Sequence, residues 1–253
     1  KLLLLTLLAV GTFAANAHQF EVGGIYYNLN GTNAVVTYRG TDPSAYRDRY
    51  RGNVVIPGSL IYNGEIYPVK SIGTEAFRGC SVTSVTIPNS VISIDNDAFR
   101  NCGGLTSVTI PNSVISIGDR AFYGCSVTSV TIPNSVTLIG TEAFRNCSGL
   151  TSVDIGNSVI SIGRSAFRSC DGLTSVTIGN SVTSIVDSTF YDCRALTSVT
   201  ISNSVTSIGG SAFAYCSGLT SVIIPNSVVS IDGEAFRGCS GLTSVIIPNS
   251  VVS

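Results

Sequence analysis

The chain has 253 residues, of which 11% are charged and 44% are hydrophobic, and its formal net charge is −1. This composition excludes a disordered chain and the basic surface of a nucleic-acid-binding protein. The single histidine, His18, rules out a metal site with several histidine ligands and leaves Ser-His-Asp catalysis dependent on one residue. We therefore expect an ordered, secreted protein that is not an enzyme, with no cofactor, no metal and no nucleic-acid partner.

Residues 1–17 are predicted to be a secretory signal peptide. Lys1 precedes a short apolar stretch, and Ala15-Asn16-Ala17 provides a small-x-small site, so we expect cleavage after Ala17. The apolar stretch is shorter than the ~20 residues that span a bilayer, so no transmembrane segment is expected. The chain ends at Ser253 inside a repeat unit. We expect the native protein to continue beyond it, with a sorting or anchoring domain.

Residues 18–52 are expected to form a β-hairpin cap over the body of the protein. Residues 25–29 and 34–38 flank Asn30-Gly31-Thr32-Asn33, which predicts a hairpin. A second hairpin is expected at residues 60–62 and 66–69, around Asn63-Gly64. The charged run at residues 46–51 is expected to be a surface loop.

Residues 53–253 consist of one repeat, with about eight or nine units of 22 or 23 residues. A phenylalanine and a cysteine mark each unit, three positions apart: Phe77 and Cys80, Phe99 and Cys102, Phe122 and Cys125, Phe144 and Cys147, Phe167 and Cys170, Phe190 and Cys193, Phe213 and Cys216, Phe236 and Cys239. Two units are one residue shorter, because Cys80 and Cys125 lack the glycine that follows in Cys147-Ser148-Gly149.

The first part of a unit is predicted to be a strand. Val108 and Ile110 lie two positions apart in a stretch rich in β-branched residues. Pro111 is expected to end the strand, because proline has no N–H for the ladder. Val114 and Ile117 are expected to point inward on the return leg.

The last part of a unit is predicted to be about one helical turn, at residues 119–124. Asp119 has the side chain of an N-terminal cap. Ala121, Phe122 and Cys125 are expected to face the core.

Stacked units would bury a continuous core and form one long parallel sheet, with strands ~4.8 Å apart. This predicts an α/β solenoid of the leucine-rich-repeat type, a right-handed arc roughly 40 Å long with short helical turns. A three-sided parallel β-helix is the alternative.

The pattern Leu-x-x-Val-x-Ile-Pro-x-x-Val-x-x-Ile-Gly-x-x-Ala-Phe-x-x-Cys resembles the repeat of BspA-like, or Treponema-type, leucine-rich-repeat proteins over residues 53–253. The resemblance implies a surface or secreted protein. It also implies that the better-known members are adhesins, which bind host extracellular-matrix proteins and other bacteria. Gly156, Gly179 and Ser202 depart from the pattern, since they replace the proline.

Three interpretations of the cysteine column stay open: disulfides, metal ligands and buried thiols. Export would permit disulfides. In a stack, however, neighbouring Cβ atoms stay ~4.8 Å apart, whereas a disulfide requires roughly 3.8 Å. No histidine or carboxylate recurs in phase as a metal ligand. We favour buried, reduced thiols without disulfides.

The outward positions of the strands form the first candidate site. They are Ser84, Thr86, Ser107, Thr109, Ser129, Thr131, Ser152, Asp154, Ser175, Thr177, Ser198, Thr200, Ser221, Ile223, Ser244 and Ile246. Such residues are either soluble, β-compatible surface or a binding surface for a protein or a repetitive polymer. Ile223 and Ile246 place apolar side chains beside a polar rim, as in interface cores. We expect contact to centre there.

The position after each phenylalanine forms a second candidate surface. It reads Arg78, Arg100, Tyr123, Arg145, Arg168, Tyr191, Ala214 and Arg237. Arginine and tyrosine are enriched in interface hot spots. Glu75, Asp97, Glu142 and Glu234 lie three positions before four of the arginines, which predicts solvated ion pairs on helical turns.

Together these patterns favour a secreted or cell-surface module that binds a protein, such as a host matrix protein, or a glycan. Two alternatives stay open. The solenoid could be a structural spacer that projects another domain, or its Ser/Thr rows could bind a regular lattice such as a polysaccharide or ice.

Overall fold

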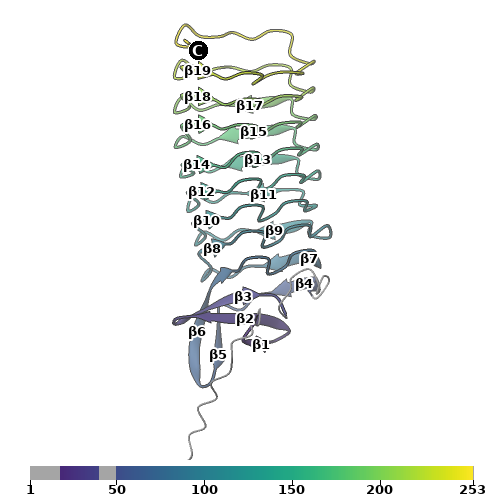
Figure 1. Ribbon diagram of the computed structural model, residues 1–253, viewed down its shortest axis with the longest axis vertical. Coiled ribbons are helices and arrows are strands. Elements are labelled where there is room, and N and C mark those ends of the chain that lie inside the picture. Colours follow the sequence, from purple (N-terminus) through teal and green to yellow (C-terminus); the bar gives the residue numbers. More distant parts are fainter. Residues whose placement is uncertain (1–17, 40–49, 253) are drawn as a thin grey trace, which may run out of the picture.

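The computed structural model describes residues 18–39 and 50–252. The predicted signal peptide with its cleavage site after Ala17, and most of the charged run at 46–51, lie outside the described residues. Figure 1 shows a rod of stacked coils with longer strands at its N-terminal end. The described part of the chain contains 19 strands and no helix.

The first side of each coil is the predicted strand, whose residues alternate between core and solvent. These strands are β7 (Ser81–Thr86), β9 (Ser107–Thr109), β11 (Val130–Thr131), β13 (Ser152–Ile155), β15 (Ser175–Ile178) and β17 (Ser198–Thr200). Pairing is parallel and in register, with Val153 opposite Val176 and Thr177 opposite Thr200. β4 (Arg51–Val55) also pairs in parallel with β7, with a shift of register between Gly52 and Asn53. We call the solvent side of these strands the long-strand face.

The return leg of each coil forms a second parallel ladder, so the prediction of a single sheet was wrong. Its strands are β8 (Ser93–Ile94), β10 (Ser116–Ile117), β12 (Leu138–Ile139), β14 (Ser161–Ile162), β16 (Ser184–Ile185), β18 (Ser207–Ile208) and β19 (Ser230–Ile231). Val114 and Ile117 are buried, as predicted. A strand of two residues is too short to show a periodicity in the sequence. Its hydrogen-bond partners lie in neighbouring coils, so the sequence of one unit does not reveal it either.

The third side of each coil, the turn side, is a run of turns, and the helical turn predicted at residues 119–124 was wrong. The N–H of Tyr123 donates to the carbonyl of Arg120, but the N–H of Phe122 donates to Ala143 in the next coil at 2.7 Å. Arg120 has a φ of 54°, in the left-handed region that a right-handed helix excludes. Alternate N–H groups therefore bond the next coil instead of building a helix.

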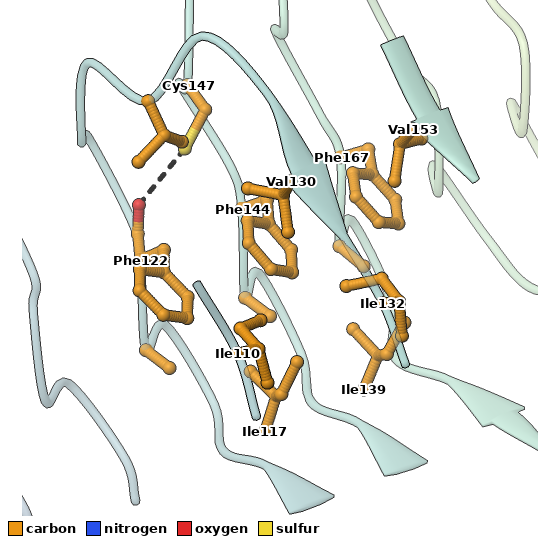
Figure 2. Packing of buried hydrophobic residues seen from close by; sticks show 14 of the residues in the cluster. Ile110, Ile117, Phe122, Val130, Ile132, Ile139, Phe144, Cys147, Val153 and Phe167 are labelled. Atoms are coloured by element: carbon orange, nitrogen blue, oxygen red, sulfur yellow. Dashed lines mark hydrogen bonds between the residues drawn. The ribbon is translucent and has the colours of Figure 1, made fainter. Parts of the chain in front are cut away.

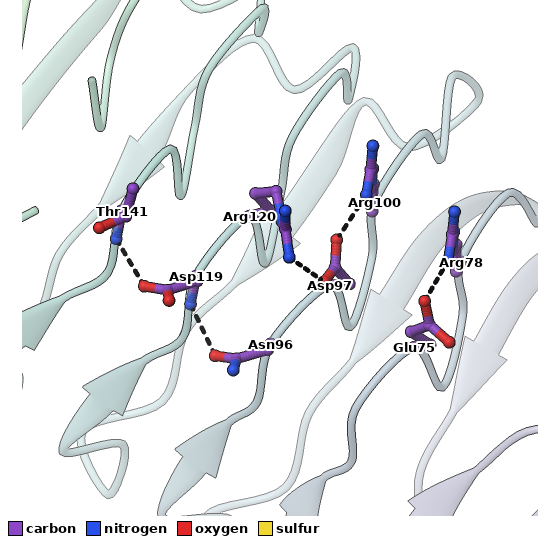
Figure 3. Close-up of polar contacts among 8 residues, drawn as sticks. All are labelled: Glu75, Arg78, Asn96, Asp97, Arg100, Asp119, Arg120 and Thr141. Carbon is purple, nitrogen blue, oxygen red and sulfur yellow. Dashed lines mark hydrogen bonds and ion pairs between the residues drawn. The ribbon is translucent and has the colours of Figure 1, made fainter. Parts of the chain in front are cut away.

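Asp119 links coils and does not cap a helix as predicted. Its Oδ1 accepts the N–H of Thr141 in the next coil at 2.7 Å. Its own N–H donates to Oδ1 of Asn96 in the previous coil at 2.8 Å, and Figure 3 shows both bonds. The polar side chain at this position thus holds successive coils together at the start of the turn side.

The phenylalanine rings form one continuous stack through the core, from Phe77 to Phe236. Ring centroids of successive coils lie 4.9–5.5 Å apart, and the ring planes are nearly parallel. Figure 2 shows Phe144 and Phe167 in this stack, above columns of buried isoleucines. Tyr50 packs on the N-terminal end of the stack, with its ring centroid 4.5 Å from that of Phe77 and its plane tilted by 45°.

All eight cysteines are thiols outside disulfides, and all are buried beside these rings. In seven of them Sγ donates to the carbonyl of the phenylalanine one coil earlier, at 2.8–3.1 Å. Figure 2 shows this bond from Cys147 to Phe122. Burial raises the pKa of Cys147 to about 12 and that of Cys239 to about 11. At neutral pH these thiols are therefore protonated donors.

Both predicted hairpins are confirmed at the N-terminal end. The first consists of β2 (Ile25–Asn30) and β3 (Asn33–Thr37), with β1 (Phe20–Val22) beside β2. The second consists of β5 (Ser59–Tyr62) and β6 (Glu65–Ile72). β3 pairs with β6, and β6 with β8, so the hairpins continue the short ladder. The Tyr50 hydroxyl accepts the Tyr26 N–H and donates to the Thr37 carbonyl, which joins the ring stack to the first hairpin.

Replacing Phe167 by alanine should lower the free energy of unfolding by about 3–5 kcal/mol. Its ring is buried, and the centroid of this ring lies 5.3 Å from that of Phe144 and 5.5 Å from that of Phe190. Arg168→Ala is the matched control, because its guanidinium lies over the Tyr191 ring at the surface and its loss should cost about 1 kcal/mol or less. Urea titrations followed by circular dichroism measure both. A larger effect of the arginine variant would contradict the assignment of inside and outside.

Iodoacetamide at pH 8 should label few cysteines in the folded chain and all eight in denaturant, without a reductant. The thiolate is the reactive form, and burial raises the pKa of thiols such as Cys147 well above this pH. Mass spectrometry counts the labels. Disulfides between neighbouring coils, detected in the unreduced protein, would contradict the prediction that these cysteines are reduced.

Candidate functional site

The long-strand face brings together all the side chains proposed as binding residues. Each of the twelve is exposed: Ser107, Thr109, Ser129, Thr131, Ser152, Asp154, Ser175, Thr177, Ser198, Thr200, Ile223 and Ile246. Ladder pairing sets Asp154 between Thr131 and Thr177, and Ser152 opposite Ser175. The residues therefore form two parallel rows on one surface.

The hydroxyls in these two rows are available to a ligand or to water. Within the described chain, those from Ser107 to Thr200 donate to no protein acceptor. The neighbouring threonine column behaves differently, because Thr151 and Thr174 donate to backbone carbonyls one coil earlier, at 3.2 and 2.9 Å. The two rows thus present hydroxyl groups without protein partners, and hydrogen bonds between coils hold the strands that carry them.

A groove follows one edge of the long-strand face, between the outward threonines and the asparagines of the Asn-Ser-Val triplets. It includes a hollow of about 450 Å³ at Thr86 and Asn112, one of about 610 Å³ at Asp154, and one of about 430 Å³ at Thr200 and Asn226. In the sequence these asparagines only marked the phase of the repeat. Their place on the groove follows from the turn after each strand.

The asparagine side chains are themselves tied to the stack. Oδ1 of Asn134 accepts the N–H of Asn157 at 3.2 Å, and Oδ1 of Asn157 accepts the N–H of Asn180 at 3.1 Å. Their amide NH2 groups have no acceptor within the part of the chain that the structure describes. The groove therefore presents amide donors beside the hydroxyl rows. The chain's one histidine, His18, lies elsewhere, with its ring 4.8 Å from that of Tyr26 in the N-terminal region.

The two isoleucines on the long-strand face lie next to each other. Ile223 and Ile246 pair in parallel through an isolated β-bridge. Their side chains are 83% and 84% exposed. Thr200 shares a hollow with Ile223, so the apolar pair adjoins the hydroxyl rows directly.

On the turn side, the four predicted ion pairs form, although across turns and not on a helix. They are Arg78–Glu75, Arg100–Asp97, Arg145–Glu142 and Arg237–Glu234. Figure 3 shows the first two and a contact that the sequence analysis missed, from Arg120 to Asp97 one coil away at 3.0 Å. That contact connects successive coils, so the repeat spacing alone does not reveal it.

The arginines of this column also stack on tyrosines. The guanidinium carbon of Arg168 lies 4.2 Å from the ring centroid of Tyr191, and that of Arg100 lies 5.2 Å from Tyr123. Arg168 follows Ser165 where the paired arginines follow an acid. The charged and aromatic side chains of the turn side are thus mostly engaged with one another.

The short-strand ladder exposes an apolar row that the sequence analysis did not single out. Ile92, Ile115 and Ile160 are exposed in one row with Thr137, and the exposed Leu138 lies in the adjacent row, opposite Ser116. The N–H of Ile115 donates to the carbonyl of Ile92 at 2.8 Å, which stacks the two side chains. Only the second ladder, which was not predicted, brings these residues of successive coils side by side.

No cluster of three His, Cys, Asp or Glu side chains within residues 18–39 and 50–252 is arranged to hold a metal ion. No helix in those residues has the length and apolar character needed to cross a membrane.

Comparison with known proteins places this geometry in a family. The BspA type leucine rich repeat region matches residues 70–197 and 138–253, with six copies. No curated protein matches the chain. A leucine-rich repeat protein of T. pallidum, whose crystal structure is known, is 28% identical, with a TM-score of 0.68 over 79% of this chain and 90% of that one.

A second crystal structure, of a leucine-rich repeat protein from Eubacterium ventriosum ATCC 27560, is 26% identical. Its TM-score is 0.66, over 77% of this chain and 52% of that one. Both are leucine-rich repeat proteins, in agreement with the resemblance of the repeat pattern. Since the family match covers most of its residues, this chain belongs to the BspA type leucine-rich-repeat family.

Proposed function

We propose that this chain is a non-catalytic module of a secreted or cell-surface protein and that it binds a protein partner through the long-strand face. Membership of a leucine-rich-repeat family supports a binding role. The observation that carries the proposal is the exposed pair Ile223 and Ile246, which lies at the end of rows of free hydroxyls.

Rigidity favours this face for binding. Its side chains project from strands that pair in register, as Ser175 does with Ser198. The short Ser and Thr side chains have little rotamer freedom to lose on contact, so a partner meets a surface that is already ordered. The turn side is less suitable, because a partner there would compete with existing ion pairs such as Arg145–Glu142.

The anatomy of the patch supports a contact at the isoleucine pair. Interface cores are apolar and are surrounded by a polar rim. Ile223 and Ile246 provide the apolar part, and Thr200 with Ser221 provides polar neighbours. Burying two exposed isoleucines releases the free energy that drives most protein association.

Changing Ile223 and Ile246 together to lysine should weaken binding to a protein partner at least tenfold. Two charges would then have to be desolvated where apolar surface was buried. Surface plasmon resonance against immobilised collagen, laminin and fibronectin is the measurement. Changing Ile223 and Ile246 to threonine tests the apolar contribution without adding charge, since Thr177 and Thr200 occupy the equivalent positions.

Arg145→Glu with Arg168→Glu is the matched control on the turn side, and it should leave binding unchanged. Circular dichroism should show every variant folded. If only the arginine pair affects binding, the long-strand face is the wrong surface. If none of the three matrix proteins binds the parent chain, the proposed class of partner is wrong.

Export is part of the same proposal, and it depends on residues 1–17. When the full sequence is expressed with its leader in a bacterial host, N-terminal sequencing of the exported protein should begin at His18. The small residues Ala15 and Ala17 fit the cleavage site. Ala17→Phe should block processing, with Ala9→Phe as the control within the apolar stretch. An exported protein that retains Lys1 would contradict cleavage.

A further inference from the structure

Three departures from the repeat meet at one place on the groove. This place is the hollow of about 610 Å³ that spans three coils around Asp154, called here the Asp154 hollow. Its lining includes Thr109, Ser129, Thr131, Asn134 and Gly156. Each kind of departure also occurs singly elsewhere, at Cys80, at Gly179 and Ser202, and at Ile223 and Ile246, so the coincidence of all three distinguishes this stretch of the groove.

The first departure is a shortened connection. Cys125-Ser126-Val127 lacks the glycine found in most units, so the coil that follows begins one residue early. The long-strand ladder is interrupted at this point, because β9 pairs with β7 and β11 with β13, in separate sheets. The Asp154 hollow lies on this break, with Thr109 on one side and Thr131 on the other.

The second departure is the carboxylate itself. Asp154 stands in a row whose other members in this part of the chain are threonines, namely Thr86, Thr109, Thr131, Thr177 and Thr200. Threonine, at the equivalent position of the neighbouring coils, already provides a soluble and β-compatible residue. An aspartate in the middle of a sheet is disfavoured, so local strand stability does not explain it.

The third departure is Gly156, which replaces the proline in the same coil. A Cβ atom at Gly156 would lie 2.9 Å from the carbonyl oxygen of Ile132 and 3.1 Å from Oδ1 of Asn134. The missing side chain therefore lets this coil approach the floor of the hollow closely. Gly156 and Asp154 both line the hollow, two residues apart.

The chemistry of the hollow fits a neutral sugar. Hydroxyls donate and accept, the Asn134 amide donates, and the Asp154 carboxylate accepts, while Ile132 and Pro133 supply an apolar part. No arginine or lysine lines the hollow. A pyranose ring needs such a set, because its hydroxyls donate and accept and its C–H face is apolar. The volume falls within the usual range of small-molecule sites.

We propose that the Asp154 hollow binds a neutral saccharide, and that Asp154 accepts hydrogen bonds from two adjacent hydroxyls of one sugar ring. A protein partner fits this hollow less well, because no aromatic or arginine anchor lines it. The saccharide proposal goes beyond the proposed protein contact. The coils of Thr177 and Thr200 separate Asp154 from Ile223, so either site can fail alone.

Isothermal titration calorimetry of the full chain against maltotetraose, cellotetraose, xylotetraose, mannotetraose and laminaritetraose tests the proposal. At least one should bind, and Asp154→Thr should weaken that binding about tenfold to a hundredfold, the usual effect of losing a hydrogen bond to a charged group. Thr is native at this position in neighbouring coils, so the variant should fold. Asp154→Asn, which keeps the shape and loses the charge, should weaken binding by less than the threonine variant.

The matched control moves the carboxylate by one coil. The double variant Asp154→Thr with Thr177→Asp keeps the net charge of the chain but moves the carboxylate one coil further from the break in the ladder, to a position that does not line the hollow. It should bind as weakly as Asp154→Thr alone. Equal binding by the double variant and the parent would overturn the proposal, because the hollow would then be irrelevant.

Two other results would also overturn it. The first is no binding by any of the five tetrasaccharides. The second is binding of a tetralysine peptide that requires Asp154 and weakens steeply with salt, without saccharide binding, since screening of that kind marks a site for cations. Neither result bears on the isoleucine pair, which the matrix-protein experiment tests with separate variants.

Discussion

Hydrogen bonds from each coil to the next are the constraint on which this structure depends. The Phe122 N–H bonds the Ala143 carbonyl on the turn side, and Ile117 pairs with Ile139 on the short ladder. The Cys147 thiol adds a bond to the Phe122 carbonyl inside. Since buried polar groups must find partners, a coil shifted by one residue would lose bonds on all sides at once. Register is therefore fixed, and like residues stack on like.

The same stacking divides the outer surface by side. A residue type that recurs at one position becomes a row, so acids and arginines gather on the turn side while hydroxyls gather on the long-strand face. Exposed ion pairs contribute little to stability, and contacts such as Arg168 over Tyr191 leave those groups occupied. The long-strand face has the opposite character, because the hydroxyls of its two rows from Ser107 to Thr200 have no partner in the described protein. Selection for binding can therefore act on that face with little effect on folding.

The sequence predicts the features that one unit carries by itself. The phase of the repeat, the inward Val114 and Ile117, and both hairpins are confirmed. The second ladder, the bond from Asp119 to Thr141 and the thiol bonds to carbonyls were not predicted, because each needs an atom in a neighbouring coil. The prediction of a helical turn was wrong for the same reason. The spacing of Ala121, Phe122 and Cys125 suits a helix, but alternate backbone N–H groups of this segment bond carbonyls of the next coil. In the candidate site, the exposed rows could be predicted from the alternation of core and solvent residues along each strand. The Asp154 hollow could not, because it lies at the break between β9 and β11, which depends on pairing between coils.

A perfect repeat cannot define where a partner sits. Identical coils ~4.8 Å apart offer a ligand several equivalent registers, and a partner then slides among them without specificity. Specificity is a difference in affinity between alternatives, so one register must differ chemically from the next. On the long-strand face that difference comes only from departures in the described rows, the carboxylate of Asp154 and the apolar pair Ile223 and Ile246. The residues that recur in every coil thus form the scaffold, and the residues that depart from the repeat determine where a partner binds.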